Sequence, residues 1–574
     1  MRYLLTLVLI TCLHQSAFAI DAYIVAGQSN GWRISHLKQA KATKETTGPR
    51  VHYFGMNCVA EPNSSQLVTL TAMDENTMGY GTAKALADRT GEDIVFIQYC
   101  RCGASVLNRA KNGWWPGEDP ASGKSFDDGL FASFELYMQS AREQVKKQLG
   151  EELEVKGLLW HQGESDAQRD KGEFTKAVKN SFGRFRSILG KELTIVAGHI
   201  RELSDGAREI NEALDQVAAQ QVGTLTVPVA DLQFGPDRDG KPDVHISLTG
   251  CHELGRRMAN SLIAWKLQAE VEKVGGSISF NDGDFSKVTS IDLYNGNNPL
   301  KKRGGPNEQV TDAWLKNLSK VASIKTLSLA NCVVTNEGMK LIGKLKGLEE
   351  LNLTLTAVSD EGLQYLGDLT ELRVLGLASS QCSGAGFAHL KKLTKLENVN
   401  FHYTPLNDEG LQAISNVGIN GRLWFAHVKF TDEGAKSLAK IKGLKTVGMG
   451  SNNPASSGAA VASLVGLPIE NLALLDNQAT PEGIAHAAKI STLLKLDVSH
   501  APKATDDSLR LLAQLPNLEE LRIGAAREIT DAGVATLINA KALKKLSLHG
   551  LSTVTDAGIA KLKSARPNLD IEVK

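Results

Sequence analysis

The chain has 574 residues, its 64 Lys and Arg are balanced by 64 Asp and Glu, and 42% of its residues are hydrophobic. This length exceeds that of one ordinary domain, so at least two are expected. The zero formal charge provides no overall basic field for nucleic acid or an anionic surface, and no nucleic-acid partner is expected.

The first 19 residues are typical of a secretory signal peptide. Arg2 supplies the positive charge, residues 4–13 form a short apolar core, and Ala17-Phe18-Ala19 fits a cleavage site. An uncleaved anchor is the alternative, but the core is short for a membrane-spanning helix and no later stretch is suitable. We expect a secreted or periplasmic protein with no transmembrane segment after signal removal.

Cysteines are sparse in the mature chain. Cys12 leaves with the signal, and the remaining residues are too few for a disulfide scaffold. Cys100 and Cys102 are too close together for a C-x2-C zinc knuckle, although one disulfide in this region stays open. We expect no metal site.

From about residue 20 to 270, apolar strand-like runs alternate with amphipathic helical stretches. Strands are predicted at 22–26, 94–99, 155–160, 193–197 and 225–229, and helices near 81–90, 131–149, 174–189, 207–220 and 248–274. This alternation predicts an α/β domain with a doubly wound, flavodoxin-like parallel sheet and helices on both faces. Reactive groups in such a fold lie beyond the carboxyl ends of the strands.

Polar motifs follow these predicted strands where they end. The first strand ends at Gly27-Gln28-Ser29-Asn30, the second at residues 100–105 and the third at residues 160–166. A polar loop over 231–243 follows the fifth strand and leads to His245. All four segments are expected on one rim of the sheet, although taken alone Ser29 also fits a helix-capping serine.

These motifs together resemble the SGNH-hydrolase superfamily, and most closely the sialate O-acetylesterase and acetylxylan esterase group of carbohydrate esterases. The resemblance rests on Gly-Gln-Ser-Asn at 27–30, His-Gln-Gly-Glu at 161–164 and a histidine before a long helix, and it covers about residues 20–270. It implies that Ser29 is the nucleophile and His245 the general base. It also implies an oxyanion hole made by the backbone N–H groups of Ser29 and Gly103 and the side chain of Gln162.

The carboxylate behind His245 stays open. The superfamily places an aspartate three residues before the histidine, and this position is Pro242 here. Asp243, two residues before the histidine, and Glu164 in the Gln-Gly-Glu motif are the main candidates, and Asp237 and Asp239 are weaker ones. The family also commonly has methionine where this chain has Gly31.

Serine ester hydrolysis needs a nucleophile, a base that takes its proton, and donors for the oxyanion. The residues named above fill these roles without a metal or cofactor. We therefore expect removal of O-acetyl groups from an acetylated carbohydrate through an acetyl-serine intermediate. The alternative is a binding protein with a degenerate esterase domain. Trp114 and Trp115 fit either a sugar-stacking wall or ordinary packing.

The second half of the chain is repetitive. Thr-Asp-x-Gly and related motifs place glycines at 338, 362, 386, 410, 434, 458, 483, 533 and 558, at spacings of 24 or 25 residues, with Ser508 in a gap. A strand-like run precedes each motif and a short helical stretch follows it, which predicts a leucine-rich repeat solenoid over 277–574. The Thr-Asp pair is typical of a helix N-cap with an acidic first turn.

Solenoids of this kind usually present their strand face to a partner, so a protein or polysaccharide partner of the repeats is expected. His402, Tyr403, Trp424 and Phe425 fit either a contact patch or a variation in packing. The expected organisation is a signal peptide over 1–19, an esterase domain over 20–270 and the repeats over 277–574.

Overall fold

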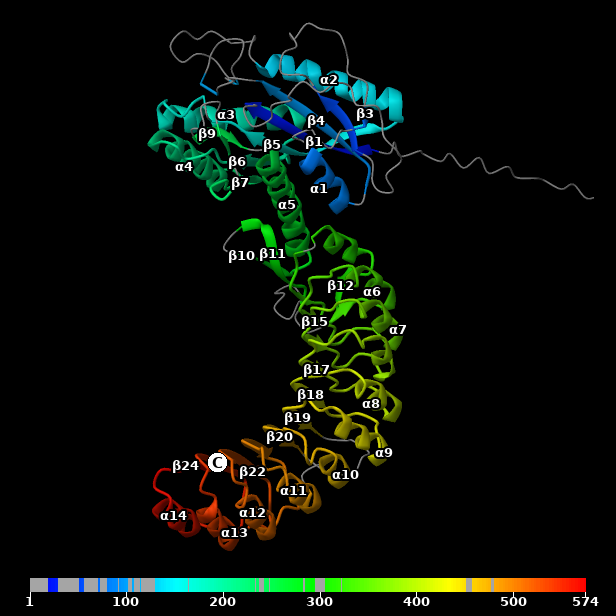
Figure 1. The fold of residues 1–574 in the computed structure, drawn as a ribbon, viewed down its shortest axis with the longest axis vertical. Helices are drawn as coiled ribbons and strands as arrows, with labels where there is room; N and C mark the ends of the chain where they lie inside the picture. The colour runs from blue at the N-terminus through cyan, green and yellow to red at the C-terminus, as the bar shows by residue number, and fades with distance from the viewer. Residues whose placement is uncertain are drawn as a thin grey trace, which may run out of the picture. The chain divides into compact units, whose positions relative to one another are not determined.

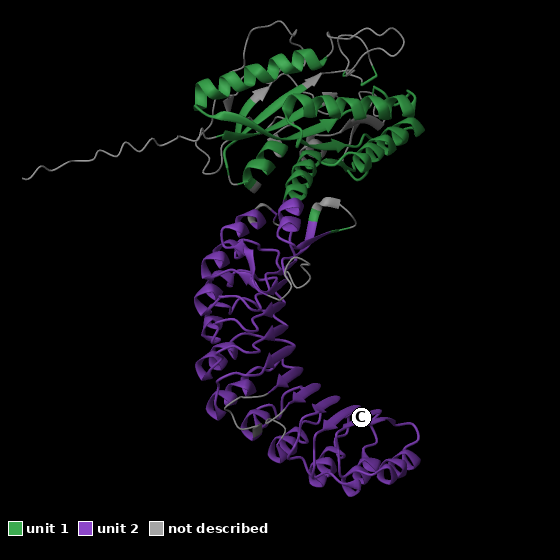
Figure 2. Cartoon of the chain, turned by 180° about the vertical axis from the view of Figure 1, so that it is seen from behind, with its two compact units in different colours: residues 1–266, 280–287 green, residues 267–279, 288–574 purple. Residues whose placement is uncertain are grey.

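The computed structural model describes residues 19–28, 51–55, 71–72, 80–90, 92–101, 106–107, 114, 130–163, 165–232, 234–236, 242–246, 248–281, 284–294, 305–321, 323–450, 457–475 and 480–573. The chain divides into two compact units, residues 1–266 with 280–287 and residues 267–279 with 288–574 (Figure 2). The expected signal peptide lies outside the described residues except for Ala19, which starts the first strand. The domain boundaries at 270 and 277 stay predictions.

The first unit is built on a seven-stranded sheet with the order β3-β2-β4-β1-β5-β6-β7. Its strands are β1 (Ala19–Gln28), β2 (Val51–Gly55), β3 (Thr71–Ala72), β4 (Ile94–Arg101), β5 (Glu152–His161), β6 (Thr194–Gly198) and β7 (Thr224–Val227). The strands pair in parallel except for β3, which runs antiparallel to β2. The five strands expected from sequence keep the flavodoxin-like order β4-β1-β5-β6-β7, so the predicted fold class is confirmed.

Two strands of this sheet were not predicted from the sequence. β2 and β3 lie together at one side of the sheet, and β2 carries His52 and Tyr53 in place of a continuous apolar run. A short strand near a sheet edge needs less apolar sequence than a central one, because less of it is covered by neighbouring elements.

Helices cover both faces of this sheet (Figure 1). One face packs against α2 (Leu130–Leu149), α3 (Lys171–Leu189) and α4 (Asp205–Gln220), whose buried side chains share a core with Ala22, Ile24 and Ala26 of β1. The other face packs against α5 (Leu248–Lys273), since a Cβ atom on Gly157 of β5 would lie 2.5 Å from Leu262. Helix α1 (Tyr80–Thr90) packs beside α5, with Thr82 against Gly255.

Trp114 belongs to the core of the first unit. Its side chain is fully buried and its ring lies 5.1–5.3 Å from those of Phe131, Trp160 and Phe185. A sugar-stacking wall that includes Trp114 is therefore wrong, because aromatic packing against α2, α3 and β5 leaves no exposed ring face. Trp115 lies outside the described residues.

The second unit is an α/β leucine-rich repeat-like solenoid, as predicted. One sheet orders its strands β10-β11-β13-β15-β16-β17-β18-β19-β20-β21-β22-β23-β24, and β12 pairs with β14 beside it. The strands are β10 (Ser277–Asn281), β11 (Asp284–Asp292), β12 (Asn307–Thr311), β13 (Thr326–Ser328), β14 (Cys332–Val333), β15 (Glu350–Asn352), β16 (Val374–Gly376), β17 (Asn398–Asn400), β18 (Arg422–Phe425), β19 (Thr446–Met449), β20 (Asn471–Leu474), β21 (Lys495–Val498), β22 (Glu520–Gly524), β23 (Lys545–His549) and β24 (Asp570–Val573).

Each repeat returns through a short helix. These helices are α6 (Asn336–Ile342), α7 (Asp360–Leu363), α8 (Asp408–Ile414), α9 (Asp432–Ala435), α10 (Ser457–Ala462), α11 (Pro481–Ala487), α12 (Asp506–Leu512), α13 (Asp531–Thr536) and α14 (Asp556–Ala565), with 3-10 segments at 314–320, 364–366, 385–389, 436–440 and 537–539. Within this unit the strands line the inner side of the arc and the helices its outer side (Figure 2).

The Thr-Asp-x-Gly motif links successive repeats. Thr431 caps its own helix by accepting a hydrogen bond from the N–H of Glu433, and it donates its own N–H and hydroxyl to Asp408 of the preceding repeat, at 2.6 and 2.7 Å. A Cβ atom on Gly434 would lie 2.2 Å from Asp408 Oδ1, so glycine makes room for that carboxylate. The same links join Asp312 to Thr335, Asp506 to Thr530 and Asp531 to Thr555.

The four residues that fit either a contact patch or a variation in packing differ in their exposure. Phe425 is fully buried, and its ring packs 5.0 Å from that of Phe430, so packing is the correct interpretation for this residue. Tyr403 is 61% exposed, and His402 and Trp424 line a cavity on the strand face.

We predict that Asp506→Ala lowers the free energy of unfolding of the repeats by about 1–3 kcal/mol, because two hydrogen bonds to a charged acceptor are lost. Asp556→Ala is the matched control, since Asp556 holds the same motif position but accepts no such bond among the described residues. Denaturant unfolding compares the two variants. An equal loss of unfolding free energy in the two variants would show that the hydrogen bonds between repeats do not contribute to stability.

Candidate active site

Strand β1 occupies the point where the strand order reverses. It pairs with β4 on one side and β5 on the other, so that Gly27 is in register with both Cys100 and His161. At such a reversal the segments beyond the carboxyl ends of the two flanking strands diverge and leave a crevice. The segments that follow β1, β4 and β5 therefore start next to one another at this edge of the sheet.

Several expected site residues lie just beyond these strand ends. Ser29 comes directly after Gln28, the last residue of β1, and Gly103 is two positions beyond Arg101, the last residue of β4. Ser29, Gly103 and Glu164 themselves lie outside the described residues. Their roles as nucleophile, oxyanion donor and supporting acid stay predictions.

Gln162 is described in full and is held in a fixed orientation. It directly follows β5 and is fully buried, and its Nε2 donates to Asp166 Oδ2 at 3.2 Å. This bond fixes the direction of the side-chain amide.

Asp166 lies next to the candidate site, and sequence reasoning assigned it no role. Its buried carboxylate also accepts from the backbone N–H groups of Val106 and Leu107, at 3.1 and 3.4 Å. One carboxylate thus joins the segment after β4 to the segment after β5. The sequence does place an acidic residue in the same turn as the Gln-Gly-Glu motif. A carboxylate that is buried there needs hydrogen-bond donors around it, so its presence could have indicated this role.

His161 packs at the end of its strand. It is buried, it pairs in register with Gly198 of β6, and a Cβ atom on Gly198 would lie 3.0 Å from His161 Nδ1. That Cβ atom on Gly198 would also lie 3.4 Å from the side chain of Leu254 of α5. These contacts favour a packing role for His161 over a place in the site.

His245 and Asp243 lie on a strand, where the sequence suggested a loop running to residue 243. Strand β9 (Pro242–Ile246) pairs antiparallel with β8 (Phe234–Pro236), with Phe234 opposite Ile246 and Pro236 opposite Pro242. The expectation missed this hairpin because its strands are short and its proline content is typical of a loop. The structure describes the backbone of residues 243 and 245 but not their side chains.

Arg257 of α5 fixes the segment that leads into this hairpin. Its guanidinium donates to both carboxylate oxygens of Asp231, each at 2.7 Å, and to Glu253 at 2.9 Å. The hydrogen bond from Arg257 lowers the pKa of Asp231 to about 2. Asp231 lies in the segment between β7 and β8, so this contact joins that segment to helix α5.

A second histidine lies at the same end of the sheet. His199 directly follows β6, and its Nε2 lies 2.9 Å from Asp215 of α4, which also accepts from Thr226 at 2.6 Å. Burial opposes ionisation of Asp215, but the bonds from His199 and Thr226 leave its pKa below the ordinary value. The histidine lines a cavity of about 480 Å³ with Arg201 and Glu202. Its bond to Asp215 joins β6 and β7 to α4.

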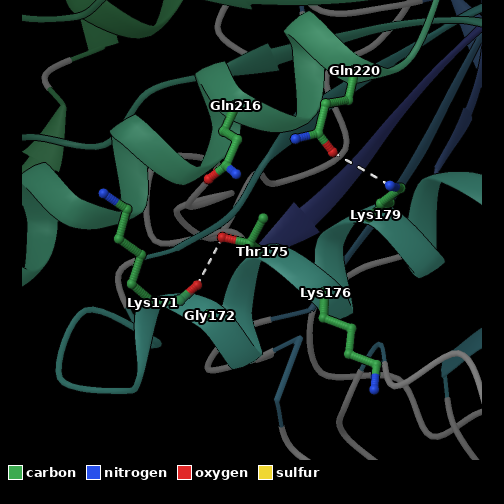
Figure 3. Close-up of a pocket in the computed structure, with 7 residues that line it drawn as sticks. All are labelled: Lys171, Gly172, Thr175, Lys176, Lys179, Gln216 and Gln220. Carbon is green, nitrogen blue, oxygen red and sulfur yellow. Dashed lines mark hydrogen bonds between the residues drawn. The ribbon is translucent and has the colours of Figure 1, made fainter.

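Another cavity, of about 500 Å³, lies between α3 and α4 (Figure 3). Its lining residues are Lys171, Gly172, Thr175, Lys176, Lys179, Gln216 and Gln220. Lys179 donates to Gln220 across it at 3.3 Å. This lining contains no nucleophile–base pair, so we assign it no part in the reaction.

Among the described residues, no group of three or more His, Cys, Asp and Glu side chains is arranged to hold a metal ion. None of the helices described is long and apolar enough to cross a membrane.

Comparison with known proteins agrees with a chain of two parts. Residues 19–264 match the family model of the carbohydrate esterases described as sialic acid-specific acetylesterases. Residues 322–343 and 347–367 match a leucine-rich repeat model. These matches confirm both resemblances, that of the first part to carbohydrate esterases and that of the second part to leucine-rich repeats. No curated protein matches the sequence.

Solved structures show similarity to either part. A protein from Arabidopsis thaliana is 17% identical, with 43% of this chain and 98% of that chain covered and a TM-score of 0.31. NanS is 11% identical, with coverages of 44% and 98% and a TM-score of 0.29. An internalin from Listeria monocytogenes is 15% identical, with coverages of 54% and 94% and a TM-score of 0.31.

We predict that Asp166→Ala lowers the free energy of unfolding of the first unit by about 2–4 kcal/mol, because buried donors lose their acceptor at about 1–3 kcal/mol each. Asp170→Ala is the control, since Asp170 caps α3 by accepting from the N–H of Glu173 at 2.8 Å, and its loss should cost about 1 kcal/mol. Calorimetry measures both. A smaller loss for Asp166→Ala than for Asp170→Ala would contradict the assigned role.

Proposed function

We propose that this protein is an exported serine esterase, because residues 19–264 match the family model of the sialic acid-specific acetylesterases among the carbohydrate esterases. It removes O-acetyl groups from carbohydrates through an acetyl-serine intermediate. The observation that supports this most strongly is the place of Ser29, directly after β1 where the strand order reverses.

The reaction needs only groups of the chain and water. The Ser29 hydroxyl attacks the acetyl carbonyl carbon while His245 takes its proton. The N–H groups of Ser29 and Gly103 and the amide of Gln162 donate to the oxyanion. As the tetrahedral intermediate collapses, His245 passes the proton to the sugar oxygen, and the deacetylated carbohydrate leaves. Water, activated by His245, then hydrolyses the acetyl-serine and releases acetate.

Asp166 supports this oxyanion hole from behind. It holds the Gln162 amide at 3.2 Å and anchors residues 106 and 107, just after the segment that carries Gly103. Donors that are oriented before the reaction stabilise the developing charge without reorganising during it. Asp166 acts as a positioning residue in this scheme, because it contacts Gln162, one of the three proposed donors, and takes no part in the bonds that form and break.

Asp243 is the acid that we assign to His245. Positions 243 and 245 are two apart on β9, and alternate positions of a strand lie on the same face. Pro242, at the position where the superfamily has its aspartate, falls on the opposite face. A strand therefore lets an aspartate two residues before the histidine replace one that lies three before it in a loop.

Replacing the nucleophile tests the activity itself. Ser29→Ala should lower acetate release from an aryl acetate and from acetylated xylan by more than about a thousandfold, because only binding and the oxyanion hole remain. Ser187→Ala on the outer side of α3 is the control, since that hydroxyl bonds only to Arg184 among the described residues. Activity that survives in Ser29→Ala would refute the mechanism.

No activity in the unmodified chain would favour the second candidate, a binding protein with a degenerate esterase domain. The observation behind this alternative is Pro242 at the expected position of the acid.

The proposed signal peptide can be tested on the same preparation. Determining the first residue of the exported protein should give Ile20 or Asp21.

Two isosteric substitutions separate the candidate acids. Asp243→Asn should lower kcat by about a thousandfold or more, because a neutral amide neither holds the required tautomer of His245 nor stabilises its charged form. Glu164→Gln should change kcat by less than about tenfold. Steady-state kinetics on the aryl acetate measures both, and the reverse order would assign the role to Glu164.

A further inference from the structure

The strand face of the second unit carries a row of amide, glycine and aromatic residues at one register position. Asn352, Gly376, Asn400, Trp424 and Gly448 pair in this order across β15, β16, β17, β18 and β19. Neighbouring strands lie about 4.8 Å apart, so the row is about 19 Å long. We call these five residues the amide–aromatic row.

The two asparagines of the row are oriented by the backbone. Asn352 Oδ1 accepts from the N–H of Thr354, and Asn400 Oδ1 accepts from the N–H of His402, each at 3.0 Å. Neither Nδ2 group donates to another residue in the part of the chain that the structure describes. Each asparagine thus offers amide N–H donors whose direction is set before any ligand binds.

Gly376 leaves space beside these donors, and Gly448 makes room for the ring of Trp424. A Cβ atom on Gly376 would lie 2.8 Å from Asn352 Oδ1, so a side chain there would displace the first amide. A Cβ atom on Gly448 would lie 2.0 Å from the ring of Trp424. The result is a cavity of about 560 Å³, whose lining includes Asn352, Gly376, Asn400, His402, Arg422 and Trp424.

Trp424 supplies an aromatic surface within this cavity. Its ring lies over Gly448 and beside His402, with centroids 6.1 Å apart and planes 27° apart. The Arg422 guanidinium lies 6.0 Å from the centre of the same ring. An indole surface beside oriented donors suits a ligand that has both an apolar face and hydroxyl groups, as a sugar ring does.

The charge of the cavity argues against a strongly charged ligand. Its charged lining residues are the acidic Asp292 and Glu350 and the basic Arg422, so the lining carries no excess of positive charge. Burial and the neighbouring His427 lower the pKa of His402, so its ring is neutral at pH 7. A nucleic acid or a polyanionic glycan would need a row of basic side chains, whereas neutral amide donors match hydroxyl and acetyl oxygens.

We propose that the amide–aromatic row binds an uncharged polysaccharide chain, with its sugar rings against Trp424 and its oxygens bonded to Asn352 and Asn400. The choice of polysaccharide rests on the proposed function, since the O-acetylated substrate of the first unit is itself a carbohydrate. The row is then a binding site separate from the reaction site, and its occupation does not depend on hydrolysis.

Binding is measured on the full chain carrying Ser29→Ala, by calorimetry and affinity electrophoresis, with acetylated xylan, deacetylated xylan and acetylated glucomannan as probes. Adding Trp424→Ala should weaken binding at least tenfold, and Trp424→Phe should restore part of it. Asn352→Asp with Asn400→Asp should also weaken binding at least tenfold, because aspartate keeps the acceptor for the backbone but lacks the amide donors. Lys545→Ala on β23, away from the row, should leave affinity unchanged.

Failure of this inference can be told apart from failure of the proposed function. In the chain that retains Ser29, Trp424→Ala should leave aryl acetate hydrolysis unchanged while raising KM on acetylated xylan. Unchanged affinity in the row variants, binding of none of the three probes, or capture of a protein partner by the row in their place would each overturn the inference. An inactive chain that still binds polysaccharide through Trp424 would support it and refute the esterase.

Discussion

The pairing of β1 between β4 and β5 is the constraint on which the first unit depends. Both faces of β1 are covered, so its interior residues are apolar on both sides and the strand has no freedom to shift its register. This places Gln28 level with Arg101, and so brings the segments after β1 and β4 together. The sheet thus fixes the end of the strand that directly precedes Ser29 in the sequence.

A large part of this architecture was predictable because it is repeated or periodic. The apolar run of β1 and the helical spacing of Leu254, Met258 and Leu262 in α5 each reflect burial that one chain segment reveals by itself. The hairpin of β8 and β9 was not predictable in this way, since two short strands acquire their identity only from each other. Asp166 is similar, because its donors at 106 and 107 are about sixty residues away in the sequence.

The two units use acidic side chains for comparable tasks. In the first unit, Asp166 joins two segments at the candidate site, and Asp231 joins the chain after β7 to Arg257. In the second unit, Asp408 joins one repeat to the next. Asp166 and Asp408 each accept backbone N–H groups that have no partner within a helix or strand, whereas Asp231 forms a bidentate ion pair with Arg257 near the surface.

The links between repeats also give the solenoid a direction. In four repeats an aspartate accepts from the threonine that caps the helix of the following repeat, so each of these helix starts depends on the repeat before it. A break in the array is therefore asymmetric. The C-terminal fragment begins with a threonine that has lost its acceptor, whereas the N-terminal fragment ends with a carboxylate that water can solvate. Removing repeats from the N-terminal end of such an array should thus destabilise the new terminal repeat more than removing repeats from the C-terminal end.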